Sequence, residues 1–157
     1  MNLPKSLEIK VSNYDGYFGL FAKLPIKKGG RIFQFKGFMG SDAQTSELAL
    51  QIDEDIFLES NESYSYENFL NHSCCPNGYI DFKNLYFTVL KDIRKGEELT
   101  FNYNTTEYDL LDTVTPSNFI CNCKSERCIK EVKGFRYLTL KQKIELQPYL
   151  SPFLQKN

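Results

Sequence analysis

Three cysteines near the end of the chain have the spacing of metal ligands. Cys121, Cys123 and Cys128 form the pattern C-x-C-x4-C within eight positions. Ordinary buried or unligated thiols are the alternative, but the loop has too few apolar residues to form a core, and a tetrahedral Zn2+ with thiolate ligands at about 2.3 Å would supply one. A fourth ligand must come from a distant segment, where Cys74 and Cys75 are the candidates. A zinc ion held by four thiolates has no open position for water, so metal-assisted hydrolysis is disfavoured.

Two further segments each combine polar, aromatic and turn residues. They are NHSCCPN at 71–77 and GEELTFNY at 96–103. His72 is the only histidine and stands beside Ser73 and Cys74, so a nucleophile with its general base is one interpretation. Adjacent residues rarely have the geometry for that chemistry, and no nucleophile elbow or other local signature accompanies them. A serine or cysteine hydrolase is therefore disfavoured.

The order NHSCCPN, GEELTFNY and then C-x-C-x4-C closely resembles the SET-domain protein lysine methyltransferases with a post-SET zinc motif. The likeness extends from the glycine-containing stretch 16–22 to Cys128. It implies a fold of small curved sheets with a knot-like crossing, in which the NHSC and ELTFNY segments meet. The implied activity is methyl transfer from S-adenosylmethionine to the ε-amine of a lysine in a protein substrate, a histone or another protein.

The resemblance also implies roles for individual residues. Cys74 becomes the fourth ligand of a structural Zn2+, with Cys75 as a bystander. Tyr103 takes the position of the catalytic tyrosine, and Phe101 takes the position that borders the lysine channel. Phenylalanine there implies di- or trimethylation. The residues implied in binding S-adenosylmethionine are Phe18, Gly19, Phe69, Asn71, His72 and Ile129.

The physical chemistry of these residue types suits methyl transfer. In a strand covering 99–103, Leu99, Phe101 and Tyr103 would share one face, so the two rings could line one channel. Transfer from a sulfonium needs a neutral amine, close alignment and exclusion of water. Aromatic walls bury the lysine stem, attract cations over their π faces and leave a phenol hydroxyl to orient the amine. Tyr64 and Tyr66 precede NHSC closely enough to reach the same channel.

Three positions depart from the family pattern. Tyr17 replaces the first glycine of a G-x-G sequence, Asn68 replaces an arginine three positions before Asn71, and Asn102 replaces the acidic residue before Tyr103. These changes motivate a second hypothesis, a SET-like protein-interaction module that has lost catalysis.

Composition and charge argue against several other classes of function. The chain has 157 residues with 41% hydrophobic, 15% aromatic and 25% charged, which is typical of one globular domain. A formal net charge of -1 and no basic aromatic stripe argue against direct nucleic-acid binding. Neither a membrane span nor a secretory signal is visible, so the expected compartment is intracellular and reducing. Acidic residues between 42 and 62 could attract a basic histone tail.

Hydrophobic patterning predicts a mainly β protein with short helices. Apolar residues alternate or cluster as in strands at 7–11, 17–22, 32–38, 48–52, 79–82, 85–90 and 99–103. One helical turn is expected at 67–70. A C-terminal helix should start at the capping box of Thr139 and Gln142, dock through Leu140 and Ile144, and end at Pro148.

We expect three regions: a SET domain at 1–116, a post-SET zinc-binding segment at 117–133 and a C-terminal helical extension at 134–157. Residues 26–32 and 93–99 have similar sequences, which we interpret as shared turn chemistry rather than a repeat array.

Overall fold

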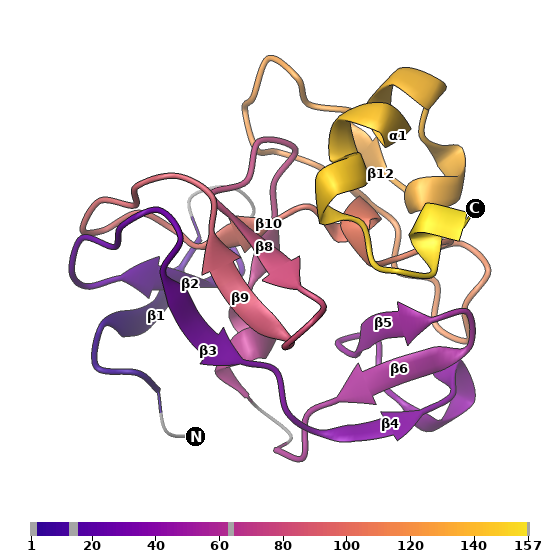
Figure 1. The fold of residues 1–157 in the computed structure, drawn as a ribbon, viewed down its shortest axis with the longest axis horizontal. Coiled ribbons are helices and arrows are strands. Elements are labelled where there is room, and N and C mark those ends of the chain that lie inside the picture. The colour runs from indigo at the N-terminus through magenta and orange to yellow at the C-terminus, as the bar shows by residue number, and fades with distance from the viewer. Residues whose placement is uncertain (1–2, 13–15, 63–64, 157) are drawn as a thin grey trace. The chain divides into compact units, whose positions relative to one another are not determined.

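The computed structural model describes residues 3–12, 16–62 and 65–156 (Figure 1). Clustering of contacts divides the chain into two compact units, each built from three separate stretches. Unit 1 consists of Met1–Phe35, Glu62–Asn102 and Asn122–Cys128, and unit 2 consists of Lys36–Asn61, Tyr103–Cys121 and Ile129–Asn157. No helix in the described ranges is long and apolar enough to cross a membrane.

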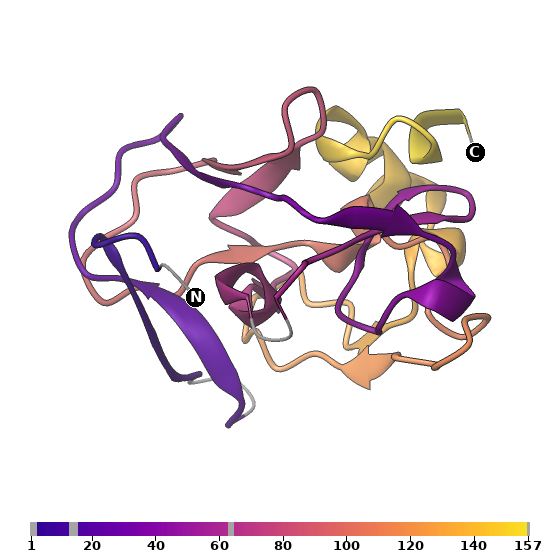
Figure 2. The same cartoon turned by 90° about the horizontal axis from the view of Figure 1, so that it is seen from below.

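Unit 1 is built from strands and one short helical turn. Strands β1 (Leu7–Val11) and β2 (Phe18–Ala22) form an antiparallel pair, which Figure 2 shows edge to edge. A three-stranded antiparallel sheet has the order β3-β9-β8. The remaining elements are the 3-10 turn η2 and a two-stranded parallel sheet of β7 and β10. Their bounds are β3 Arg31–Gln34, η2 Tyr66–Phe69, β7 Asn71–His72, β8 Gly78–Asp81, β9 Tyr86–Val89 and β10 Thr100–Phe101.

Aromatic rings organise the packing of the three-stranded sheet. Phe87 is fully buried and its ring stacks on Phe33, with centroids 5.6 Å apart. Phe33 also makes an edge contact with Tyr66, at 4.9 Å between centroids. A β-carbon at Gly78 would overlap the Phe87 ring, so the strand needs glycine at the point where this ring crosses it.

Unit 2 contains a second three-stranded antiparallel sheet, of order β4-β6-β5, and a short hairpin of β11 and β12. Most of its helical turns follow the hairpin. The strands are β4 Phe38–Gly40, β5 Leu50–Asp53, β6 Ile56–Glu59, β11 Phe119–Ile120 and β12 Glu131–Val132. The helix and 3-10 turns are η1 Asp42–Gln44, η3 Tyr103–Thr105, η4 Phe135–Tyr137, α1 Leu140–Leu146, η5 Gln147–Tyr149 and η6 Leu154–Lys156.

Helix α1 confirms the predicted start but not the predicted packing. The Thr139 side chain accepts a hydrogen bond from Gln142 N, and the reciprocal half of the capping box is present. Leu140 and Ile144, expected to dock, are 74% and 63% exposed. Leu146 packs instead against the apolar cluster of the C-terminal segment. The i, i+4 spacing identified a shared helix face correctly, but it could not say that this face points outward.

The class of fold is as predicted, mainly β in small sheets, while several boundaries differ. The stretch 32–38, expected as one strand, is divided between β3 and β4. Strand β6 was not foreseen. The strand expected at 99–103 ends at Phe101, and Tyr103 begins a 3-10 turn. The shared-face argument for these two rings therefore fails.

Candidate functional site

Two motifs far apart in the sequence meet in unit 1. Strands β7 and β10 pair in parallel, with Asn71 opposite Thr100 and His72 opposite Phe101. The pairing extends by one bond, since Ser73 N donates to Phe101 O at 2.9 Å. The predicted meeting of the NHSC and ELTFNY segments is confirmed.

Asn77, at the end of the first motif, holds the second motif through both ends of its carboxamide. Its Nδ2 donates to Glu98 O at 2.7 Å, and its Oδ1 accepts from Thr100 N at 2.9 Å. Both bonds are buried. Sequence reasoning gave Asn77 no role, because nothing in its spacing shows which backbone it will contact.

The side chain of Asn71 links β7 to the start of β2. Its Nδ2 donates to Glu98 Oε1 at 2.7 Å and to Phe18 O at 3.1 Å. Glu98 is 8% exposed, and its Oε2 accepts from Ser12 Oγ at 2.9 Å. Both amide hydrogens of Asn71 are engaged within the protein, which leaves Oδ1 as the end of the carboxamide for other partners. Sequence reasoning missed Glu98 and Ser12.

Gly19 lies at the centre of this arrangement. A β-carbon there would overlap the Glu98 carboxylate and lie 3.0 Å from Asn71 Nδ2. Only glycine therefore lets β2 approach the Asn71 and Glu98 pair so closely. The neighbouring Phe18 is 57% exposed and meets Phe69 edge to face, with centroids 6.4 Å apart. Four of the residues predicted to bind the cofactor, Phe18, Gly19, Phe69 and Asn71, thus form one group.

His72 is buried beside a cysteine. Burial lowers the pKa of its imidazole to about 3, so the ring is neutral in this environment. Its Nε2 lies 3.3 Å from Cys74 Sγ. The His72 ring thus reaches the sulfur of a residue two positions along the chain. A hydrolase remains disfavoured, because Cys74 belongs to a cluster of four thiols.

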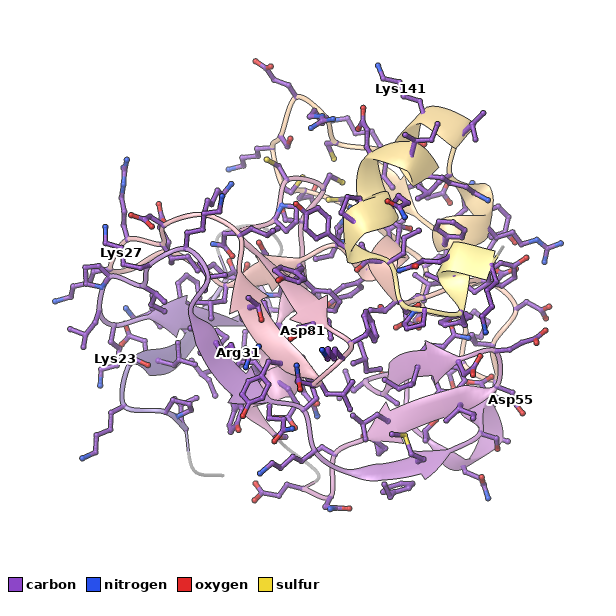
Figure 3. The ribbon with its side chains drawn as sticks, in the orientation of Figure 1. Lys23, Lys27, Arg31, Asp55, Asp81 and Lys141 are labelled. Carbon is purple, nitrogen blue, oxygen red and sulfur yellow. The ribbon has the colours of Figure 1, made fainter. Side chains whose placement is uncertain are left out.

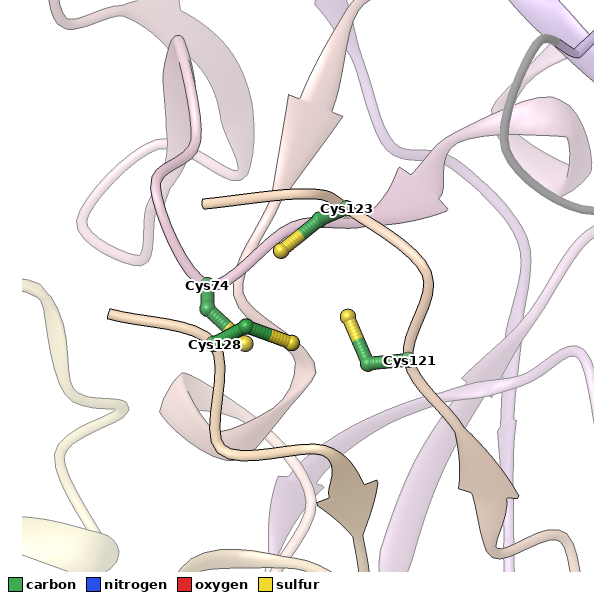
Figure 4. A group of neighbouring side chains, drawn as sticks. All are labelled: Cys74, Cys121, Cys123 and Cys128. Carbon is green, nitrogen blue, oxygen red and sulfur yellow. The ribbon is translucent and has the colours of Figure 1, made fainter. Parts of the chain in front are cut away.

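The four cysteines predicted as metal ligands converge. The sulfur atoms of Cys74, Cys121, Cys123 and Cys128 all lie within 4.8 Å of one another, as Figure 4 shows. A tetrahedral zinc ion with Zn–S distances of about 2.3 Å needs sulfurs about 3.8 Å apart, so the arrangement fits such an ion. Cys75 is exposed and lies outside the group.

The two residues predicted to be catalytic occupy different local structures. Phe101 is 7% exposed and ends β10. Tyr103 is half-buried at the start of η3, and within unit 2 its ring meets Phe119 edge to face at 5.8 Å. Ile129 is half-buried in the same unit, where its carbonyl accepts from Glu131 N at 2.9 Å.

Two tyrosines were predicted to reach the lysine channel. Tyr66 packs on Phe33, and burial together with Glu67 raises the pKa of its phenol. Tyr64 lies outside the described residues.

The three positions that depart from the family pattern have different environments. Tyr17, in place of a glycine, is 75% exposed. Asn68 is half-buried within η2, and Asn102 is 7% exposed.

Acidic residues of unit 2 gather near the turn between β5 and β6. Asp53, Glu54 and Asp55 are exposed there, and Figure 3 labels Asp55. Others serve local structure: Asp42 Oδ2 accepts from Val114 N at 2.6 Å, and Glu59 Oε2 accepts from Ser46 N at 2.6 Å.

The SET domain family matches residues 17–104. The chain is 32% identical over 148 residues to the "Variant-silencing SET domain-containing protein" of Plasmodium falciparum, covering 80% of this chain and 6% of that protein. It is 25% identical over 136 residues to a "Histone-lysine N-methyltransferase, H3 lysine-36 specific" of Candida albicans, covering 74% and 15%.

Among solved structures, the chain resembles KRYPTONITE in complex with mCHH DNA, an H3(1-15) peptide and SAH. The TM-score is 0.65 at 21% identity, covering 83% of this chain and 30% of that one. This likeness concerns the fold. The chain spans less than a third of the length of each of these three proteins.

Proposed function

The chain belongs to the SET-domain family, and we propose that it is an S-adenosylmethionine-dependent protein-lysine N-methyltransferase. The observation that carries the proposal is the parallel pairing of Asn71–His72 with Thr100–Phe101, which joins the motif implied in cofactor binding to the motif that leads to Tyr103. Relatives named as histone-lysine methyltransferases support the same activity.

The group around Gly19 is proposed to bind the cofactor. Exposed aromatic surface on Phe18, edge-packed against Phe69, offers π faces that attract a sulfonium. Because Glu98 and the Phe18 carbonyl engage the Asn71 amide hydrogens, Oδ1 can accept a hydrogen bond from an ammonium or amino group. The bound cofactor would supply an electrophilic methyl group.

Phe101 and Tyr103 are proposed to act on the lysine. Phe101 would line the channel and keep water away from the neutral amine, which would have to face the methyl carbon that the cofactor supplies. The Tyr103 hydroxyl would hold the amine in line with that carbon. Phe101 lacks a hydroxyl that could anchor a water, so we propose di- or trimethylation.

The thiolates of Cys74, Cys121, Cys123 and Cys128 are proposed to hold one structural Zn2+. Within unit 1, the neutral His72 ring could donate its Nε2 hydrogen to Cys74 Sγ, which would stabilise the negative charge on a ligating sulfur. The proposed division into a SET domain at 1–116, a post-SET segment at 117–133 and a helical extension at 134–157 places the three local cysteines in the second region.

The proposed substrate is a protein with an accessible lysine in a basic segment. The exposed acidic turn Asp53–Asp55 in unit 2 suits such a segment by charge. The names of several relatives point to histone H3, which makes histone H3 the first substrate to test.

The direct test is incubation of the purified chain with methyl-labelled S-adenosylmethionine and either histone octamers or host-cell extract, followed by mass-spectrometric mapping of methylated lysines. Cofactor binding is measured separately by calorimetry. Binding together with label on lysine supports the proposal. If the chain neither binds the cofactor nor transfers label, the result contradicts the proposal. It would then favour the interaction module that Tyr17, Asn68 and Asn102 suggested.

A further inference from the structure

The two stretches of similar sequence, 26–32 and 93–99, lie side by side in unit 1. Ile26 N donates to Ile93 O and Ile93 N donates to Ile26 O, both at 2.8 Å. The antiparallel ladder continues on either side, where Gly96 N donates to Ala22 O at 2.7 Å and Val89 N donates to Gly30 O at 3.0 Å. Because the segments run in opposite directions, their equivalent turns flank the ladder about a local twofold axis.

The two turns close with equivalent bonds. Gly30 N donates to Lys27 O at 3.0 Å, and Glu97 N donates to Arg94 O at 3.1 Å. Each is a four-residue turn whose first residue is basic. The turns thus have matching backbone bonds as well as similar sequences.

The third residue of each turn is a glycine with positive φ, 81° at Gly29 and 84° at Gly96. This is the backbone of a type II turn, in which the third position favours glycine. An ideal β-carbon at either glycine would have no atom of the described structure within 4 Å, so both tips face open space. The second residues, Lys28 and Lys95, are exposed beside them.

The ladder adds a third cation to each turn. Lys91 lies two residues before Ile93, and Lys23 follows Ala22, whose backbone pairs with Gly96 and Glu97. Lys23 and Lys27 project outward from the same edge of unit 1 in Figure 3. We call the two exposed groups the first basic triad, Lys27, Lys28 and Lys91, and the second basic triad, Lys23, Arg94 and Lys95.

Two acidic residues, Asp92 and Glu97, lie beside the triads and bind the turns. Asp92 Oδ1 accepts from Lys28 N at 2.9 Å, and its Oδ2 accepts from Lys27 Nζ at 2.7 Å. Glu97 Oε2 accepts from Arg94 N at 2.7 Å. The six exposed basic residues of the triads outnumber these two carboxylates, so this edge is positive although the chain's net charge is -1.

We propose that the two basic triads form a binding surface for the phosphate backbone of a nucleic-acid duplex. Lys28 and Lys95 lie two residues from the central isoleucine pair in opposite directions, so the two triads are separated along the ladder. Two separated groups of cations can contact phosphates on both strands of a duplex at once. The proposal differs from the expectation, drawn from overall charge, that the chain does not bind nucleic acid directly.

The test is binding of the full chain to a fluorescently labelled 20-base-pair DNA of random sequence, followed by anisotropy at several salt concentrations. The triad variant carries Lys28→Gln, Arg94→Gln and Lys95→Gln. The control variant carries Lys36→Gln, Lys141→Gln and Lys156→Gln, three exposed lysines of unit 2 with the same total charge change. Circular dichroism and thermal unfolding check that both variants fold.

We expect the triad variant to bind at least about tenfold more weakly at 0.1 M salt, and its plot of log affinity against log salt to be shallower by up to about 2.7, because each phosphate contact contributes about 0.9. The control variant should keep wild-type affinity and slope. Absent DNA binding by the wild-type chain, or equal losses in both variants, would overturn the proposal. So would stronger binding to phosphatidylserine vesicles than to DNA, since that result would identify an anionic membrane as the partner.

Discussion

Gly19 and Glu98 are packed so closely that a single added methyl group at position 19 would overlap the Glu98 carboxylate. The same carboxylate accepts from Asn71 Nδ2 at 2.7 Å. The close approach of the β2 backbone at Gly19 and the orientation of the Asn71 side chain on β7 therefore both depend on the buried carboxylate of Glu98. The resembling family usually has two glycines at this point. This chain keeps Gly19, the glycine whose missing β-carbon leaves room for the Glu98 carboxylate.

Gly19→Ala should destabilise the fold and weaken S-adenosylmethionine binding. Overpacking of this kind costs about 1–3 kcal/mol. Glu98→Ala removes the overlapping atoms, so in a double-mutant cycle the alanine at 19 should cost less in the Glu98→Ala background, with a coupling of about 0.5–3 kcal/mol. Denaturant unfolding of the four proteins measures it. Additive effects would show that Gly19 and Glu98 are not coupled.

The wild-type protein should contain one zinc ion per chain, and Cys121→Ser should lower that content and destabilise the protein, because the proposed four-thiolate site loses one ligand. Cys75→Ser is the matched control, since Cys75 is exposed and lies outside the group. Elemental analysis of both purified variants gives the stoichiometry. A Cys75→Ser variant that loses zinc would refute the ligand assignment.

The same residues show which parts of the site the sequence predicts. The family resemblance carried by NHSC and ELTFNY implied that these segments would meet, and β7 does pair with β10. Cysteine spacing predicted three local metal ligands and a distant fourth. Resemblance selected Cys74 over Cys75 as the fourth thiol, and the geometry agrees. The roles of Glu98 and Asn77 were not predicted. Their partners, the Asn71 side chain and the Thr100 backbone, are brought near them by the fold, and sequence spacing does not show this.

Periodicity failed where local turn geometry or tertiary packing decides the outcome. Alternation of apolar residues predicted a strand through Tyr103, but the strand ends at Phe101 and a 3-10 turn follows. Leu140 and Ile144 satisfied a helical spacing and still face outward, since Leu146 packs against the core of that unit. Pattern alone identifies a shared face, not what covers it.

Tyr103→Phe should slow methyl transfer much more than it weakens cofactor binding. The phenyl ring can keep its edge contact with Phe119, so the change removes mainly the hydroxyl. By analogy with the removal of one oxyanion-hole donor, the loss of this positioned contact should cost about 2.7–4 kcal/mol, a rate loss of about 100- to 1000-fold. Single-turnover rates and calorimetry separate the two effects. Asn71→Ala is the complementary variant and should weaken S-adenosylmethionine binding before it slows the reaction. A Tyr103→Phe enzyme with wild-type rates would exclude the role assigned to the Tyr103 hydroxyl.

Glu107 should make the protein less stable as the pH rises from about 4.5 to 7. Burial raises the pKa of its carboxyl from 4.5 to about 7, although Thr106 Oγ1 and Gln51 N donate to it and Asp42 lies near enough to add repulsion. Within that window the unfolded state releases its proton while the folded state keeps it. Stability is therefore greatest below 4.5 and falls by up to about 3 kcal/mol by pH 7.

Glu107→Gln keeps an oxygen that can accept both bonds but has no proton to lose. The variant should be more stable than wild type at pH 7.5 and nearly equal to it at pH 4, as measured by urea unfolding at each pH. Glu54→Gln, at an exposed position, should leave the wild-type pH profile unchanged. Parallel profiles for wild type and Glu107→Gln would contradict the role of this carboxyl.

Phe101→Tyr should shift the products toward monomethyl-lysine. Phe101 is buried at the end of β10, where a phenol hydroxyl could hold a water in the space that a methylated amine needs in order to turn. Without that hydroxyl the water is weakly held and easily displaced, so the wild-type enzyme should reach di- or trimethyl-lysine. Mass spectrometry of the product under enzyme excess compares the two, with Phe38→Tyr as an exposed control that should leave the distribution unaltered. A wild-type enzyme that stops after one methyl group, or a Phe101→Tyr variant with the wild-type distribution, would mean that another residue sets the degree of methylation.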